Sequence, residues 1–513
     1  MIELYQVFAL GAVAIVGYAL SRRPARDPRE PPAVGSSIPF IGHLLGLLQH
    51  GAGYFSIMAK KHPSLPILSI DLILTKIYIV ASPPLLQAVQ RNTKTITFDP
   101  FLTFTAERVA GIHGPGLESL REKQAGGQGV NQAVVHAMHP TLTGKSLDRM
   151  NEKMVRLLSP LVDELASLET VDLYGWCTRA ITAASTEASY GPLNPYKDRR
   201  IEDAFWAFES NLSPLLGGFL PSIIARAAWK GRETAVPALM NYYNQDGHKQ
   251  GSELTQVRFQ TMHDAGMSVE DISRLEVSMG IGLLSNTVPA CFWIIFDLYT
   301  RPDLLQEIRE EVKTNALRVT VNNTHVISIP ALRDECPLFV STYQEILRAR
   351  AASSPTRSVT EDTILADTYL LKKGSVVSIP GSAMSRHNDV WGKSADDFNP
   401  RRYLKVDSKT NNPRRTGGFM TFGVSPVVCP GRHFASSEIL GIVSMLMLRF
   451  DFVPVHSSGE WREPKRNSKA ISSAMGPVKG AFDVRVAVRE AYKGVKWDCE
   501  AKEGSGVFNL MVG

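Results

Sequence analysis

The sequence predicts a mainly α-helical chain with a smaller β region, and three long stretches support this fold class. Apolar residues recur at helical spacing from Asn151 to Gly191, and residues 277–293 form a long apolar run. A third run, which begins at His433, mixes apolar with small residues, as a buried helix does. Stretches with strand character are short by comparison, so we expect helices to dominate the fold.

The composition limits the class of protein. The chain has 513 residues, of which 44% are hydrophobic, and this is ample for a large core. Its net charge of +6, from 56 basic and 50 acidic residues, is too small to indicate nucleic-acid binding. The five cysteines are widely spaced and include no C-x-x-C pair, which indicates neither a disulfide framework nor a zinc site and fits a reducing compartment. They are Cys177, Cys291, Cys336, Cys429 and Cys499.

The N-terminus predicts a membrane anchor at residues 1–21. Leu4 to Leu20 is an uncharged 17-residue run, at the short end of what spans a bilayer. Four arginines follow it, so the positive-inside rule leaves the rest of the chain in the cytosol; they are Arg22, Arg23, Arg26 and Arg29. A cleaved signal peptide is the alternative, although its charged n-region is missing. Residues 22–42 are rich in proline and predict a stiff hinge.

We expect one large domain at 43–493, followed by a C-terminal tail at 494–513. Residues 67–80 contain two runs rich in isoleucine and leucine, which predict an early β-hairpin. Residues 481–488 alternate apolar and polar side chains and predict another strand. The segment Phe205–Trp229 is apolar and interrupted by proline and glycine, which indicates two helices joined by an apolar loop. Periodicity alone assigns it to the core.

The stretch Phe419–Phe434 reads F-M-T-F-G-V-S-P-V-V-C-P-G-R-H-F and carries the main chemical signal. Pro426 and Pro430 predict a constrained loop rather than a strand or helix. Cys429 lies on this loop just ahead of a helix, where free N–H groups and the helix dipole favour a thiolate. A thiolate binds metal or acts as a nucleophile. The alternative is a buried structural cysteine.

This stretch resembles the haem-binding loop of the cytochrome P450 family, whose usual pattern is F-G-x-G-x-R-x-C-x-G. The residues that match are Phe422, Gly423, Cys429 and Gly431. Ser425 replaces a usual second glycine, and Val427 replaces an arginine or histidine that often contacts a haem propionate. The resemblance implies the cytochrome P450 fold and haem b, with the iron bound by the Cys429 thiolate and the other matching residues around the haem.

The apolar run 277–293 contains Ser285, Asn286 and Thr287 at its middle. Pro289 cannot donate an N–H, so the Ser285 carbonyl loses its helical partner, and a polar kink in a buried helix is costly unless it is used. A transmembrane helix is the alternative. In the resembling family this helix binds oxygen beside an acid–threonine pair, whose positions fall on Ser285 and Asn286. An asparagine at this position resembles the branch of the family that holds the sterol hydroxylases and prostacyclin synthase, which carry asparagine there. We expect catalytic roles for these three residues, with waters held by them and by the freed carbonyl delivering protons.

Residues 337–350 predict a helix with Glu345 and Arg348 on one face. An E-x-x-R pair alone is more often a solvated surface pair. The resemblance implies instead that Glu345, Arg348 and Arg402 form a buried ion-pair network beneath the haem loop. It also implies that Arg357 contacts a haem propionate.

The resemblance predicts an oxidoreductase, a monooxygenase that uses O2 and electrons from NADPH, supplied by NADPH–cytochrome P450 reductase. Its substrate is expected to be a hydrophobic small molecule. C-P-G-R-H-F-A is similar to fungal enzymes of secondary metabolism, which favours a terpenoid, steroid-like or polyketide substrate. We expect a single-pass protein of the endoplasmic reticulum membrane, with Arg414 and Arg415 helping to dock an acidic redox partner.

Two alternatives remain. One is a haem-thiolate isomerase or dehydratase that acts on a peroxide without a reductase, and the other is a non-enzymatic, membrane-anchored helical binding protein.

Overall fold

The computed structural model describes residues 26–36, 38, 41–72, 75–122, 129–404, 418–467, 470–501 and 507–510. Several predictions concern residues outside these ranges. They are the membrane anchor at 1–21, parts of the Pro-rich hinge at 22–42, and the redox-partner role of Arg414 and Arg415.

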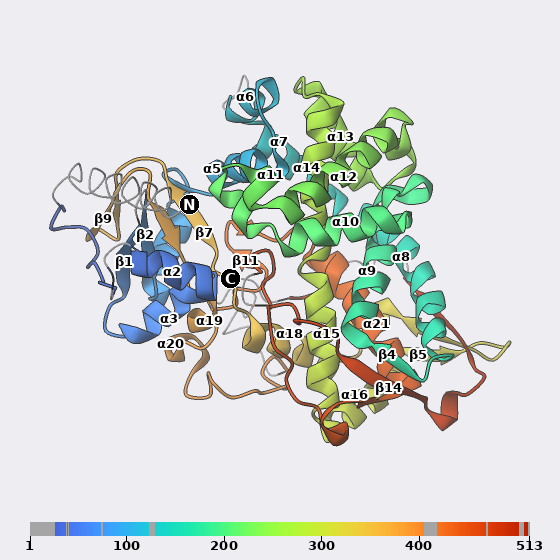
Figure 1. Cartoon of the computed structure of the whole chain (residues 1–513). Helices are drawn as coiled ribbons and strands as arrows, with labels where there is room; N and C mark the ends of the chain where they lie inside the picture. The colour runs from blue at the N-terminus through green and yellow to red at the C-terminus, as the bar shows by residue number, and fades with distance from the viewer. Residues whose placement is uncertain are drawn as a thin grey trace, which may run out of the picture.

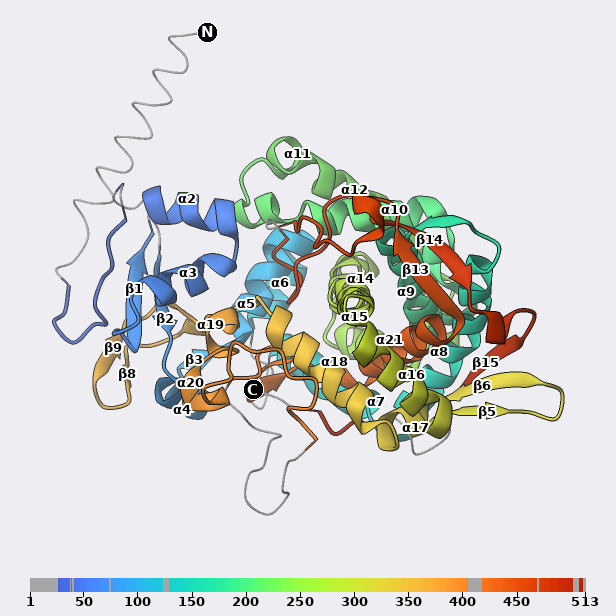
Figure 2. The same cartoon turned by 90° about the horizontal axis from the view of Figure 1, so that it is seen from below.

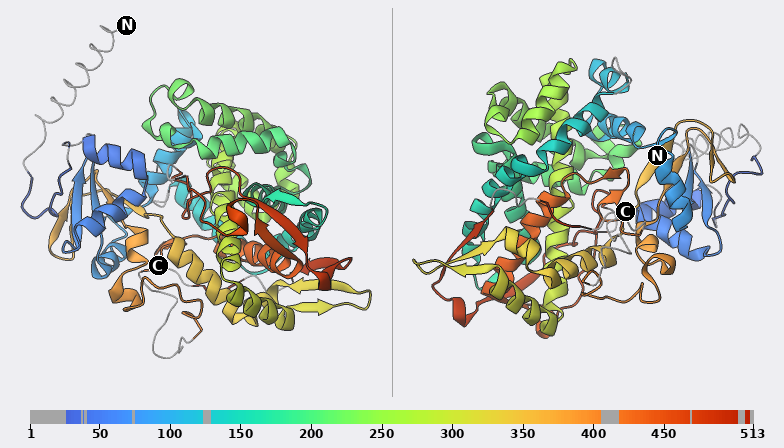
Figure 3. Two further views of the ribbon diagram at one scale, coloured as in Figure 1. Left: turned by 60° about the horizontal axis from the view of Figure 1, so that its bottom comes forward. Right: turned by 180° about the vertical axis from the view of Figure 1, so that it is seen from behind.

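The described chain has a large helical body and a smaller β-rich lobe beside it (Figure 1 and Figure 3). The longer helices are α7 (Val130–Thr141), α8 (Gly144–Leu165), α9 (Leu173–Tyr190), α10 (Arg199–Ser210), α12 (Arg226–Asn244), α13 (Glu253–Asp264), α14 (Val269–Leu284), α15 (Thr287–Tyr299), α16 (Pro302–Asn315), α18 (Pro337–Arg350) and α21 (Arg432–Arg449). The shorter ones are α2 (Ile41–His50), α3 (Gly53–Lys61), α4 (Pro83–Arg91), α5 (Asp99–Thr105), α6 (Pro115–Arg121), α11 (Pro221–Ile224), α17 (Ile329–Asp334), α19 (Gly381–Met384), α20 (Asn388–Trp391) and the π-helix η1 (Ala106–Ala110). This confirms the predicted fold class.

The lobe is built on a five-stranded sheet. In spatial order its strands are β1 (Ile67–Asp71), β2 (Lys76–Val80), β10 (Val376–Ser378), β7 (Thr356–Val359) and β3 (Ile96–Thr97). β1 pairs antiparallel with β2, with Ile67 opposite Val80, which confirms the predicted hairpin. Two three-stranded sheets have the orders β13 (Phe450–Pro454), β14 (Asp483–Val488), β4 (Thr170–Asp172), and β15 (Lys496–Glu500), β6 (Thr324–Ser328), β5 (Leu317–Val319). Two hairpins pair β8 (Thr363–Leu365) with β9 (Tyr369–Leu371), and β11 (Gly423–Val424) with β12 (Val427–Val428).

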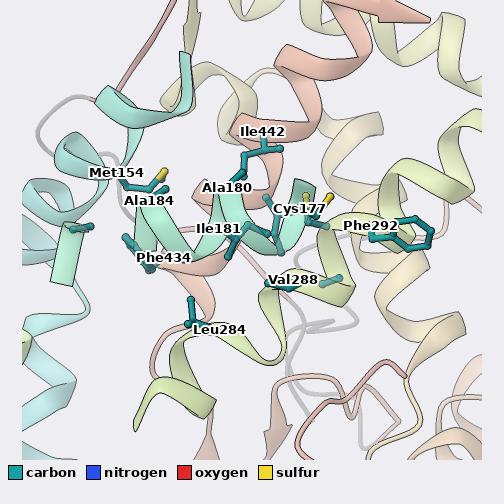
Figure 4. Packing of buried hydrophobic residues seen from close by; sticks show 14 of the residues in the cluster. Met154, Cys177, Ala180, Ile181, Ala184, Leu284, Val288, Phe292, Phe434 and Ile442 are labelled. Atoms are coloured by element: carbon teal, nitrogen blue, oxygen red, sulfur yellow. The ribbon is translucent and has the colours of Figure 1, made fainter. Parts of the chain in front are cut away.

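The core of the body lies where α8, α9, α15 and α21 meet. In Figure 4, Cys177 and Ile181 of α9 lie between Val288 of α15 and Ile442 of α21. All four side chains are fully buried. Figure 2 shows α14 and α15 at the centre of the molecule. The two segments that carry the candidate site directly precede α15 and α21. They are therefore attached to a densely packed core.

Residues 269–299, which comprise α14 and α15, are the one helical segment of the described chain that is long and apolar enough to cross a membrane. However, 72% of its most apolar window is buried inside the protein. This burial is that of a core helix, so the predicted central helix is favoured over the transmembrane alternative.

The cysteine stretch differs from the prediction that prolines exclude a strand there. β11 and β12 form a short antiparallel hairpin in which Val424 pairs with Val427. Pro426 lies in the turn between these strands, where no ladder hydrogen bond requires its missing N–H. As a consequence, Cys429 follows a backbone-paired strand directly.

The prediction of two helices joined by an apolar connection is correct in outline for Phe205–Trp229. α10 ends at Ser210, α12 begins at Arg226, and the short helix α11 lies between them. The apolar side chains of this connection are exposed, whereas periodicity alone indicated a core position; they are Phe219, Leu220, Ile223 and Ile224. Pro214 cannot continue the first helix, so Phe219 and Leu220 lie just ahead of α11, Ile223 and Ile224 lie in it, and none of them continues the core-facing stripe of α10.

Candidate active site

Cys429 lies between the β11–β12 hairpin and α21, and main-chain hydrogen bonds fix its position. Its N–H donates to the Phe422 carbonyl at 2.7 Å. Burial raises the pKa of the Cys429 thiol, whereas the N–H groups of Gly431 and Arg432 and the Arg432 charge act to lower it. Burial thus outweighs the helix effect expected from the sequence, and a bound metal ion would favour the deprotonated sulfur. The residue nevertheless keeps exposed surface, so it borders an open space.

Gly423 and Gly431 have different reasons to be glycine. Gly423 has a φ of +85°, and a Cβ added there would lie 2.7 Å from the Val427 carbonyl oxygen, so the hairpin requires glycine. A Cβ on Gly431 would meet no atom closer than the Cys429 sulfur, at 4.0 Å. The hairpin does not require Gly431, which instead keeps the space beside the sulfur clear. Phe422, which precedes Gly423, is buried.

Glu345, Arg348 and Arg402 form a buried ion-pair cluster at α18. Arg348 donates two hydrogen bonds to the Glu345 carboxylate, each 2.8 Å long, and Arg402 Nε donates a third at 3.0 Å. The Asn399 N–H donates a fourth at 2.8 Å. Burial opposes the charge of Arg348, but the hydrogen bonds and charge of Glu345 raise its pKa above the ordinary value. Glu345 and Arg348 are at most 1% exposed, so this is not a solvated surface pair.

Hydrogen bonds connect α18 to the cysteine stretch. The Thr421 hydroxyl donates to the Leu347 carbonyl at 3.1 Å, and the hydroxyl oxygens of Tyr343 and Ser436 lie 2.9 Å apart. Thr421 precedes β11 and Ser436 lies near the start of α21. Both flanks of Cys429 are therefore attached to the helix that carries the ion-pair cluster.

Arg357 of β7 is a buried cation whose hydrogen bonds go to carbonyl groups. Nη1 donates to the Thr356 carbonyl at 2.8 Å, and Nη2 donates to the Val424 carbonyl at 3.0 Å. Burial lowers the pKa of the guanidinium to about 10. Among the described residues, no carboxylate forms an ion pair with Arg357. A buried guanidinium of this kind fits an anionic group of a ligand.

The central helix breaks between α14 and α15 at the residues that the sequence singles out. Ser285 and Asn286 form the turn, and α15 starts at Thr287. The Ser285 carbonyl, which Pro289 cannot serve, accepts a hydrogen bond of 2.8 Å from the Ser473 hydroxyl. This carbonyl thus already has a protein partner, contrary to the expectation that it is free for water.

The side chains at the break are polar but carry no titratable group. Asn286 is exposed, and its Oδ1 accepts a hydrogen bond of 2.7 Å from the Ala474 N–H. The Thr287 hydroxyl donates to the Leu283 carbonyl at 3.4 Å. The Ser285 hydroxyl is buried and has no hydrogen-bond partner among the described residues. The acid that the resembling family carries at this position is therefore absent from the turn itself.

The loop 472–476 is a part of the site that sequence reasoning missed. Besides its two hydrogen bonds to the helix break, the Ala474 carbonyl accepts one of 2.7 Å from the Ala352 N–H. The Ser472 hydroxyl donates to the buried Glu209 carboxylate at 2.5 Å. The bonds to the break join residues 188 positions apart. Small residues in such a loop carry no periodic signal, so the local sequence does not predict these contacts.

Comparisons with known proteins decide the family. A family model described as cytochrome P450 matches residues 32–481. The chain belongs to the cytochrome P450 family. It is 41% identical to cytochrome P450 monooxygenase nodJ of Hypoxylon pulicicidum, over 100% of both chains. It is 23% identical to cholesterol 7-alpha-monooxygenase of Cricetulus griseus, over 85% of this chain and 89% of that one. The structure of retinoic acid bound cyanobacterial CYP120A1 has a TM-score of 0.68 at 15% identity, covering 90% of this chain and 99% of that one.

The chain is thus a cytochrome P450 monooxygenase, an oxidoreductase, as the cysteine stretch predicted. The alternative of a non-enzymatic binding protein is wrong. Membership of the P450 family implies haem-thiolate iron, dioxygen and a hydrophobic substrate. The residues present fit haem: Cys429 is exposed at a helix N-terminus, Gly431 leaves space beside the sulfur, and Arg357 is a buried cation without a carboxylate.

Proposed function

We propose that Cys429 is the axial thiolate ligand of haem b iron. The observation that carries this assignment is accessibility: of the five cysteines, Cys429 alone is exposed, and the other four are buried. Phe422, Gly423 and Gly431 shape the loop around the haem. When bound, the haem iron supplies the activation of dioxygen and the transfer of one oxygen atom to the substrate.

The charged residues near the loop have two distinct proposed roles. Arg357 binds a haem propionate, because it is buried, its hydrogen bonds go to carbonyl groups and its other described contact is the Phe98 ring 5.5 Å away, so no described carboxylate compensates its charge. Glu345, Arg348 and Arg402 form a structural network that fixes α18, and through α18 the flanks of Cys429. Such a network specifies geometry more than it adds stability.

Ser285, Asn286 and Thr287 are the proposed catalytic residues on the substrate side. Their hydroxyl and amide groups hold the waters through which protons reach the reacting oxygen. The exposure of Asn286 supports this role, because an exposed amide is accessible to water and substrate.

The proposed substrate is a hydrophobic small molecule of the terpenoid, steroid-like or polyketide class, oxidised as part of secondary metabolism. A sterol substrate in the name of one relative, cholesterol 7-alpha-monooxygenase, supports an apolar polycycle. The electrons come from NADPH through a cytochrome P450 reductase.

The proposed location is the endoplasmic reticulum membrane, with residues 1–21 as the single span and the catalytic domain in the cytosol. A set of exposed apolar side chains, which we name the apolar rim, supports contact with a membrane. It consists of Ile41, Leu44, Leu45 and Leu48 of α2, and Phe219, Leu220, Ile223 and Ile224 at α11. Figure 2 shows α2 and α11 along the same edge of the molecule.

The ferrous–CO spectrum tests the ligand assignment. Wild-type protein is expected to show the strongly red-shifted band of a thiolate ligand. Cys429→Ala is expected to fold but to retain little haem and no activity. Cys429→Ser is expected to show the same loss of haem and activity, because an alkoxide is inaccessible near neutral pH. Substantial turnover by Cys429→Ala would refute the assignment. Cys336→Ala, at a buried cysteine, is the matched control and should leave the spectrum unchanged.

One observation favours a second function, a haem-thiolate isomerase or dehydratase that acts on a peroxide. Ser285, Asn286 and Thr287 provide no acid, and a substrate that already carries an O–O bond needs no proton relay. The two functions differ in their need for a reductase. Conversion of a peroxide by wild-type protein without reductase, together with a lack of NADPH-dependent oxygenation, would contradict the monooxygenase assignment.

A further inference from the structure

The described residues close to the C-terminus pack against the helical body, beyond the family match at 32–481. We name the described residues 496–501 and 507–510 the C-terminal segment. Its strand β15 pairs in parallel with all five residues of β6, and Figure 2 shows both strands at one end of the molecule. Trp497 is buried, and its carbonyl accepts a hydrogen bond of 2.5 Å from the Ser159 hydroxyl of α8.

The last part of this segment reaches the first turn of α21. Val507 is exposed, whereas Phe508 and Leu510 are buried in the main core, so alternate residues face inward. The Phe508 N–H donates to Nδ1 of His433 at 3.1 Å. His433 is 3% exposed and stands four positions after Cys429. The C-terminal segment therefore contacts the helix turn that follows the cysteine.

The hydrogen bond requires one protonation state of His433. Because Nδ1 accepts, the ring is neutral and its proton lies on Nε2. Burial, and then the charge of Arg432, lower the pKa of His433 to about 4, so this acceptor is present at neutral pH. The ring is thus held by a main-chain donor from the far end of the sequence.

The turn that carries His433 also supplies the groups next to the cysteine. The N–H groups of Gly431 and Arg432 interact with the Cys429 thiol, and the Ala435 N–H donates to the Gly431 carbonyl at 3.0 Å. A small shift of this turn would move both N–H donors relative to the sulfur. Hydrogen bonds to a metal-bound sulfur tune and protect its bond to the metal.

We propose that the C-terminal segment is a strap that positions the haem-binding cysteine through His433. Phe508 holds the imidazole ring, the backbone of His433 holds the first turn of α21, and this turn presents its N–H groups to Cys429. His433 is a positioning residue, since it acts through the turn. The inference rests on the proposed role of Cys429 as the iron ligand.

Two substitutions break the hydrogen bond from opposite sides in the full-length holoenzyme. His433→Ala removes the acceptor, and Phe508→Pro removes the donor N–H. Each is expected to lower the fraction of haem that gives the thiolate ferrous–CO band and to speed haem transfer to apomyoglobin about tenfold, the effect of losing one buried hydrogen bond. His433→Asn places an amide oxygen near the position of Nδ1 and is expected to restore both properties.

Matched controls separate positioning from general stability. Ser159→Ala removes a hydrogen bond between α8 and Trp497 of the segment, away from the cysteine, and should lower thermal stability without changing the spectrum. Phe508→Leu keeps the N–H and should behave like wild type. Wild-type spectra and transfer rates in both His433→Ala and Phe508→Pro would overturn the inference, as would failure of His433→Asn to restore them. A thiolate band in Cys429→Ala would instead refute the ligand assignment beneath it.

Discussion

At Asn286, one hydrogen bond decides which end of the amide faces the site. Oδ1 accepts the Ala474 N–H, so the NH2 group points to the exposed side and acts there as a donor. Neither Asn286 nor the hydroxyls of Ser285 and Thr287 titrate near neutral pH. A monooxygenase must still deliver protons to the reacting oxygen. Waters bound to these groups are therefore the expected carriers.

Asn286→Leu is expected to uncouple reductase-driven turnover. The variant should oxidise NADPH and release hydrogen peroxide. The ratio of product formed to NADPH oxidised should fall about tenfold, because one hydrogen-bond donor to the relay is lost. Haem binding should persist, since Asn286 lies outside the cysteine stretch. Asn286→Asp keeps an acceptor for Ala474 but loses the amide donors. If Asn286→Asp couples like wild type, the uncoupling in Asn286→Leu comes from loss of the contact with Ala474. If Asn286→Leu couples like wild type, neither the contact nor the relay role is needed for coupling.

Glu438 of α21 is a fully buried carboxyl, and the Ser185 hydroxyl lies 2.8 and 2.9 Å from its two oxygens. Burial raises the pKa of Glu438 from an ordinary value of 4.5 to about 8, against a lowering by the Ser185 hydrogen bond. The folded chain therefore binds this proton more tightly than the unfolded chain does. The stability that this proton contributes is fully present below pH 4.5 and is lost as the pH rises toward 8.

Glu438→Gln should remove this pH dependence, because a buried amide does not ionise. Between about pH 5 and 8, wild-type stability should fall relative to the variant, with a limiting slope of about 1.4 kcal/mol per pH unit. Urea unfolding of both holoenzymes across this range measures the difference. Ser185→Ala retains the carboxyl and serves as the control. Parallel pH profiles for wild type and Glu438→Gln would show that this carboxyl does not titrate there.

Elements with strong local signals were predictable from the sequence. Helix α18 begins at Pro337 and ends at Arg350, as predicted, because proline is tolerated in the first turn and not in the helix interior. The alternation within 481–488 predicted β14, and Pro289 predicted a kink in the central helix, which the structure shows as the break between α14 and α15. In each case the deciding physics lies within a few residues.

Features that depend on distant partners were not predictable. The loop 472–476 contains small residues, and its role at the break exists only through long-range hydrogen bonds. The β11–β12 hairpin forms although Pro426 argued against a strand, because the fold places this proline in the turn. In the site, the family motif pointed to Cys429 and Arg357. The partners of Arg357, which are carbonyl groups and do not compensate its charge, are seen only in the structure.

The ion-pair cluster couples α18 to the cysteine stretch, and Glu345→Gln tests that coupling. Neutralising the one carboxylate leaves the buried Arg348 without its carboxylate partner and removes the partner of the partly buried Arg402, which costs about 3–5 kcal/mol. We expect a large loss of thermal stability and of retained haem. Glu152→Gln breaks the exposed pair with Arg156 and should cost at most about 0.5 kcal/mol. Equal stability of the two variants would contradict the structural role of the cluster.

At the scale of the whole molecule, apolar surface is distributed unevenly. The apolar rim places eight exposed aliphatic or aromatic side chains on α2 and around α11. The β5–β6 hairpin also exposes apolar side chains, Val319 and Val321, but Figure 2 shows it far from both helices. Two apolar surfaces with different positions allow a matched comparison of membrane contact.

The apolar rim is expected to bind lipid independently of the proposed anchor. A chain without residues 1–25 should still bind phosphatidylcholine vesicles in a sedimentation assay, because insertion of Phe219 and Ile223 removes apolar surface from water. Replacing both with serine should weaken binding about 10- to 100-fold, since each buried side chain contributes about 1.5–3 kcal/mol at full burial and less at an interface. The same change at Val319 and Val321 should have no effect. Equal binding of the two double variants would rule out the rim as the membrane contact.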